Sequence, residues 1–155
     1  LQACDDGDIT LESFNFDDVA IQECTDNNLI FKINNDELLL LNIPESSFAN
    51  VETPDGSPRI INVSTSNQII YRIYSDNVSS NNICATIPPA TPVVKKEWNA
   101  TGGTIEIITD ALYASDGVTI TGYTHNIKFV NVNFSGSSNS FSFTEYNFGN
   151  YETDL

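Results

Sequence analysis

Gln68-Ile69-Ile70-Tyr71-Arg72-Ile73-Tyr74 is a run in which apolar and aromatic residues recur at every second position. Successive side chains of a β-strand point to opposite faces, so Ile69, Tyr71 and Ile73 would share one face of a sheet. Residues 59–63, just before this run, alternate in the same way and are separated from it by a polar turn at residues 64–67. The two stretches therefore predict two strands joined by a turn.

The same kind of segment recurs along the chain, and this repetition predicts the fold class. Polar turns such as residues 25–28, Gly102-Gly103 and Asp116-Gly117 separate the segments. Further strands are expected at residues 19–24, 29–33, 37–43, 93–99, 104–109, 118–123, 127–134 and 140–147. Short strands at such regular spacing predict a mostly β protein: a single-domain antiparallel β-sandwich over residues 9–155, with a partly open β-barrel as the alternative.

Two segments depart from this pattern. Residues 110–114 could form a helical turn. Residues 88–92, Pro-Pro-Ala-Thr-Pro, are too short to require a domain boundary and are interpreted as a stiff crossover between sheets.

Composition limits the classes of function. A chain of 155 residues, 40% of them hydrophobic, can bury one core. With 21 Asp and Glu against 6 Lys and Arg, the formal net charge is -15. Such a charge repels phosphate groups, so nucleic acid is excluded as a partner, as is electrostatic docking on an anionic membrane.

The first eight residues carry a resemblance to a known class of protein. Leu1-Gln2-Ala3-Cys4 resembles the lipobox of bacterial lipoprotein precursors, and the resemblance implies a lipid on Cys4 and cleavage just before it. Asp5-Asp6-Gly7-Asp8 resembles the acidic export signal of surface-exposed Bacteroidetes lipoproteins, and the Asn-, Ser- and Thr-rich body looks like the flavobacterial members. The other interpretation of Asp5, Asp6 and Asp8 is a solvated tether.

This resemblance implies a location. No apolar run approaches the roughly 18 residues of a membrane-spanning helix, so the lipid on Cys4 is the expected membrane contact. The chain is expected to be an outer-membrane lipoprotein of the bacterial envelope, displayed on the cell surface. Residues 1–8 would be the lipobox remnant and the acidic tether.

Cys24 and Cys84 form the remaining pair of cysteines. An oxidising envelope favours a disulfide between them, which would stabilise the fold by about 4 kcal/mol in the chain-entropy model. A metal or redox site is the alternative, but the sequence has no C-x-x-C motif and only one His.

The residues that could support catalysis are few. The single His, His125, is expected at the surface or on an edge strand, in the connection at residues 123–127. No G-x-S-x-G nucleophile motif is present. Glu97, Glu106 and Glu145 could supply the carboxylate pair of a hydrolase, which is kept as an alternative.

Metal chemistry has equally little support. The EF-hand pattern is absent, and the oxygens of residues 76–82 fit Asx turns better than a calcium site. We expect no metal, no cofactor and no catalytic residue.

Aromatic residues are the remaining candidates for ligand binding. Trp98 lies beside Lys95 and Lys96, and Tyr71 and Tyr74 lie on the strand quoted first. Exposed rings of this kind stack on sugars, so a carbohydrate-binding module that takes a glycan is one alternative; the other is that these rings belong to the core.

The predicted function follows from these limits. We expect a noncatalytic envelope lipoprotein that acts as a binding or structural module, as an accessory subunit with a protein partner in a cell-surface complex. Burial of Trp98 discriminates between the alternatives. An exposed Trp98 would favour sugar binding, whereas a buried one would favour an interaction surface, visible as an apolar patch or an unpaired sheet edge.

Overall fold

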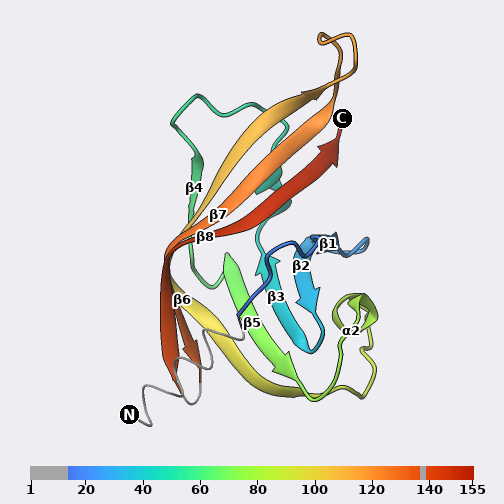
Figure 1. The fold of residues 1–155 in the computed structure, drawn as a ribbon, viewed down its shortest axis with the longest axis vertical. Coiled ribbons are helices and arrows are strands. Elements are labelled where there is room, and N and C mark those ends of the chain that lie inside the picture. Colours follow the sequence, from blue (N-terminus) through green and yellow to red (C-terminus); the bar gives the residue numbers. More distant parts are fainter. Residues whose placement is uncertain (1–13, 137–138) are drawn as a thin grey trace.

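A computed structural model describes residues 14–136 and 139–155, and their strands form one antiparallel sheet that curls into a half-barrel (Figure 1). The strands are β1 (Gln22–Glu23), β2 (Leu29–Asn34), β3 (Glu37–Asn42), β4 (Arg59–Asn62), β5 (Gln68–Tyr74), β6 (Val94–Tyr113), β7 (Ile120–Gly136) and β8 (Ser140–Asp154). Two short helices are η1 (Glu45–Phe48), a 3-10 turn, and α2 (Ser80–Cys84). The prediction of a mostly β, antiparallel fold is confirmed.

The sheet has two halves that share its longest strands. Its order is β1-β2-β3-β5-β6-β7-β8. One edge of β6 pairs first with β5, at residues 94–99, and then with β4, at residues 104–107. We call β1, β2, β3, β5 and the first part of β6 the lower half, and β4 with the later part of β6 the upper half. The long strands run between the two halves in Figure 1.

The strand β6 bends where two strands separated by a turn were expected. Gly103 has φ +103, and a Cβ on it would lie 2.5 Å from the backbone oxygen of Asn131 on β7. Only glycine fits both this backbone conformation and this close approach. The pairing register shifts on both sides of Gly102, yet β6 continues. The predicted turn at Gly102-Gly103 is therefore wrong, because the pair bends the strand without ending it.

The expected helical turn at residues 110–114 is also wrong. Residues 110–113 continue β6 and pair with β7, with Asp110 opposite Thr124. The weak local preference of this segment for helix is overridden by pairing along the full length of a neighbouring strand. The helix lies elsewhere, at α2, where the Ser79 side chain and Asn82 form a capping box.

The main core fills the concave face of the half-barrel. It contains Phe14, Phe16, Tyr71, Trp98, Ile105, Ile107, Ile127, Phe129 and Phe148 among others. A second, smaller cluster lies on the outer face of the lower half and includes Leu38, Leu40, Tyr74 and Val78. The four consecutive leucines of β3 follow from this arrangement: Leu39 and Leu41 face the main core, while Leu38 and Leu40 face the second cluster. A strand covered on both faces needs no polar alternation.

The predicted disulfide is present. Cys24 lies just after β1 and Cys84 ends α2, with their Cα atoms 5.3 Å apart and 60 positions apart in the chain. The bridge joins the β1–β2 hairpin to the segment that covers the second cluster.

Candidate functional site

The residues predicted to anchor and export the protein, Cys4, Asp5, Asp6 and Asp8, lie outside the described residues. Within residues 14–136 and 139–155, no helix is long and apolar enough to cross a membrane.

The three aromatic residues proposed for ligand binding are buried. Trp98 is 2% exposed, and its ring stacks on that of Tyr71 at a centroid distance of 5.0 Å. The indole packs over Gly136, where a Cβ would lie 2.5 Å from Trp98 Cδ1, and its Nε1 donates to Asn139 Oδ1. Tyr74 is buried on the opposite face of the sheet, in the second cluster. None of these rings presents a face on which a sugar could stack.

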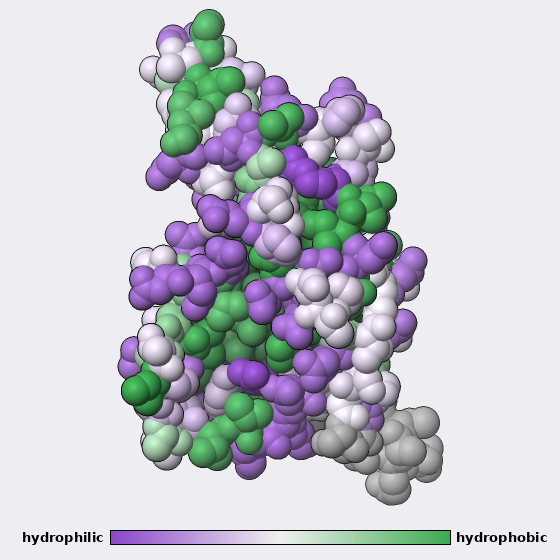
Figure 2. Space-filling view, turned by 180° about the vertical axis from the view of Figure 1, so that it is seen from behind, coloured by the Kyte–Doolittle hydropathy of each residue, from purple (hydrophilic) through white to green (hydrophobic). Residues whose placement is uncertain are grey.

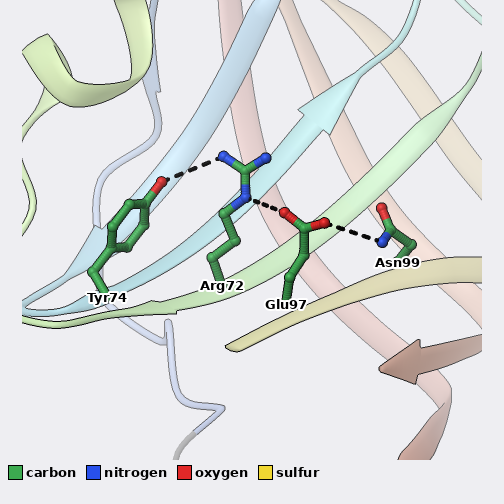
Figure 3. Close-up of polar contacts among 4 residues, drawn as sticks. All are labelled: Arg72, Tyr74, Glu97 and Asn99. Carbon is green, nitrogen blue, oxygen red and sulfur yellow. Dashed lines mark hydrogen bonds and ion pairs between the residues drawn. The ribbon is translucent and has the colours of Figure 1, made fainter. Parts of the chain in front are cut away.

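The polar ends of two of these residues take part in structural contacts. The Tyr71 hydroxyl donates to Glu37, whose carboxyl pKa is raised mainly by burial. Figure 3 shows a second set, in which Arg72 donates to Glu97 and, at 3.4 Å, to the Tyr74 hydroxyl. The other carboxylate oxygen of Glu97 accepts a hydrogen bond from Asn99. The Arg72–Glu97 pair therefore joins β5 to β6, and the Tyr71–Glu37 hydrogen bond joins β5 to β3.

The carboxylates considered for a hydrolase have other partners. Glu97 pairs with Arg72, and Glu145 lies 3.5 Å from Lys128. Glu106 lies directly across from Lys128 in the β6–β7 pairing. Glu97 and Glu145 therefore take part in surface ion pairs, which contribute little to stability, whereas Glu106 is a cross-strand neighbour of Lys128.

The described residues contain no group of three or more His, Cys, Asp and Glu that could hold a metal ion. Of the loop oxygens considered for calcium, Asn82 Oδ1 accepts from the backbone and hydroxyl of Ser79 at the start of α2. This contact belongs to the capping box of α2 and is not an Asx turn.

His125 lies in a place that differs from the expected one. It is fully buried within β7, between Thr109 of β6 and Tyr151 of β8. The prediction of a surface or edge-strand His in a connection is wrong, because β7 continues through residues 123–127 and β8 covers its other edge.

The hydrogen bonds around His125 form a chain with one consistent direction. Arg59 donates to the Thr109 hydroxyl, which lies 2.7 Å from His125 Nδ1. On the other side, His125 Nε2 lies 2.9 Å from the hydroxyl of Thr153, which donates to Asn50 Oδ1. Since the Thr153 proton is used at Asn50, Thr153 must accept from Nε2–H, and Nδ1 must accept from Thr109.

This chain makes His125 a structural residue. Both ring nitrogens are committed, and burial, followed by the charge of Arg59, lowers the pKa of His125 to about 4. The ring is therefore neutral near pH 7, and both of its nitrogens contact threonine hydroxyls of this chain.

The β6–β7 hairpin is a feature that the sequence analysis did not identify as functional. Its tip projects beyond the rest of the sheet (Figure 1). The Asp116 carboxylate accepts hydrogen bonds from the Val118 and Thr119 backbone amides and from the Thr119 hydroxyl. These bonds lower the pKa of Asp116 to about 2, so Asp116 accepts them as a carboxylate across the physiological pH range.

This ordered tip carries apolar side chains into solvent. Val118 is 77% exposed and Tyr113 is 51% exposed. Figure 2 shows hydrophobic side chains gathered at the upper end of the molecule, where the hairpin projects. Sequence analysis predicted the turn at Asp116-Gly117, but the exposure of its neighbours depends on how far the hairpin extends past the sheet.

Comparison with protein-family models, with curated proteins and with solved structures yields no match for this chain.

Proposed function

We propose that this protein is a noncatalytic envelope lipoprotein, held on the outer surface of a bacterium by a lipid on Cys4, whose β-domain binds a protein partner as an accessory subunit of a surface complex. The observation that best supports this proposal is the hairpin tip. Val118 and Tyr113 are exposed there, next to a turn in which Asp116 accepts backbone hydrogen bonds. An ordered apolar tip loses little conformational entropy when a partner covers it.

Two further observations support a protein partner over the alternatives. Burial of Trp98 and Tyr71 removes the stacking faces expected of a carbohydrate-binding module. His125 and Glu97 have partners within the chain, which supports a noncatalytic role over a hydrolase that would use these two residues.

The partner interaction is tested by pull-down of the lipidated protein from its own membrane in mild detergent. The double variant Val118→Ser/Tyr113→Ser should lose the specific protein partner. The matched control is Ile87→Ser, since Ile87 is 86% exposed but lies between α2 and β6, in the lower half. Recovery of no specific protein with the wild type, or equal recovery with the double variant, would contradict the proposal.

The anchor and the absence of catalysis are tested separately. Cys4→Ala in the native host should leave the precursor uncleaved and unlipidated, and external protease should reach the domain on intact cells carrying the wild type. Normal processing of the variant would refute the anchor. Turnover of any glycan by the purified protein would refute the noncatalytic assignment.

A further inference from the structure

The two ends of the curled sheet approach each other without joining. In the described part of the chain, no backbone hydrogen bond links β1 to β8. Side chains meet across this line: the Glu23 carboxylate of β1 is close enough to the Tyr151 hydroxyl of β8 to raise its pKa, and both residues line one pocket. We call this line of approach the seam.

A pocket of about 480 Å³ opens on one side of the seam. The β1–β2 hairpin forms one wall, η1 forms another, and Tyr151 closes the third side. The disulfide fixes the hairpin wall through Cys24, so the pocket is bounded by anchored elements.

Aromatic rings supply the apolar surface of this pocket. Phe48 and Tyr151 both line it, with ring centroids 5.0 Å apart at an angle of 64°. Phe48 in turn packs against the buried ring of His125, at 5.5 Å. Phe48 is only 9% exposed, so the partly exposed ring of Tyr151 presents most of the aromatic surface of the pocket.

The charge of the pocket has a single sign. Glu23, Asp26 and Glu45 contribute carboxylates, and of the described lining residues none is Lys or Arg. Burial, Glu23 and Glu45 together raise the pKa of the Tyr151 hydroxyl, which places both carboxylates in electrostatic range of this one phenol.

We propose that this pocket binds a small organic cation, with its ammonium group between the carboxylates of Glu23 and Glu45 and its carbon skeleton against the rings of Phe48 and Tyr151. An ammonium group gains from carboxylates and from the electron-rich face of an aromatic ring, whereas an anion would be repelled by both. The net charge of -15 would also draw cations toward the molecule. The pocket is separate from the hairpin tip, so this inference does not depend on the proposed protein partner.

The test is a titration of the full, isotope-labelled chain at pH 6 and low salt, followed by NMR. Glucosamine and butylamine are the cationic probes, and glucose and N-acetylglucosamine are the neutral sugars matched to glucosamine. Either amine should shift the amide signals of residues 23–30 and of Tyr151, and the neutral sugars should not. Absence of binding by both amines, or equal binding of the neutral sugars, would overturn the inference.

Isosteric variants locate the binding charge. Glu45→Gln should weaken binding of the amines about threefold to tenfold, and Glu23→Gln should do the same. Glu106→Gln removes the same charge from the later part of β6, in the upper half of the sheet, and should leave the affinity unchanged. Equal weakening in all three variants would mean that only the overall charge attracts the amines, and would overturn the assignment to the pocket.

Discussion

His125 is held as a neutral imidazole by its neighbours, and this makes the fold sensitive to acid. The pKa of the ring is about 4 in the folded protein, against about 6.5 for an exposed imidazole. Between these values the unfolded chain binds a proton that the folded protein does not. The contribution of the neutral His125 ring to the free energy of unfolding is therefore fully present above about pH 6.5. It is lost as the pH falls toward 4, and the loss is at most about 3 kcal/mol.

Urea unfolding at pH 7 and at pH 4.5 measures this loss. Many carboxylates also titrate in acid, so the variant His125→Gln serves as the reference. It should be less stable than the wild type at pH 7, and the difference between the two proteins should narrow at pH 4.5. A difference that stays constant across this range would show that His125 does not supply the acid sensitivity.

Individual residues show where sequence reasoning stops. The strand containing Tyr71 was predicted from its own alternation, and the structure confirms it. Burial of Trp98 and His125 could not be predicted in this way, because it is set by strands far along the chain: Gly136 and Asn139 for the indole, Thr109 and Thr153 for the imidazole.

Among the elements, β6 bends at a position, Gly103, where only glycine fits the backbone conformation and the close approach of β7. Gly103→Ala should lower the free energy of unfolding by about 2–3 kcal/mol or more, since it adds a backbone clash at Asn131 to the strain of a positive φ. Gly117→Ala is the matched control, because Gly117 has φ +73 but open space around its Cα. It should cost only about 1 kcal/mol. Equal losses in chemical denaturation would contradict the role of close packing at the bend.

The disulfide acts on a different element, the β1–β2 hairpin. Cys24→Ala/Cys84→Ala should lower the free energy of unfolding by about 2–4 kcal/mol while leaving the circular dichroism of the sheet unchanged. The wild type measured in reducing agent should match the double variant. Two free thiols in the unreduced wild type, detected by mass spectrometry, would refute the bridge.

Element boundaries were the weaker part of the sequence prediction, for a physical reason. Residues 93–99 and 104–109 were expected as separate strands, and residues 118–123 and 127–134 likewise. A glycine pair or a polar stretch signals a possible turn locally, but a neighbouring strand of equal length can pair across it and keep the chain extended.

At the scale of the whole molecule, charge repulsion opposes folding. The chain carries 21 acidic and 6 basic residues, and only two ion pairs form among the described residues. Raising NaCl from about 10 to about 150 mM shortens the screening length from about 30 to about 8 Å. The melting temperature should therefore rise by several degrees, as measured by calorimetry, and a constant or falling value would contradict this expectation.

The pocket at the seam is a candidate site that could not be predicted from the sequence. Its walls come from residues 23–30, from η1 and from Tyr151, which is more than a hundred positions away. No local pattern joins them, because they meet only when the sheet curls. The anchor at Cys4, by contrast, was inferred from four consecutive residues and stays a prediction.

The strands β6, β7 and β8 cross from one half of the sheet to the other, and this has a consequence for how such a protein can change over generations. Neither half could be exchanged by recombination for a half from another protein, because the exchange would cut three strands at once. New binding properties are expected to arise in its loops, at the hairpin tip and beside the seam, where substitutions leave the shared strands intact.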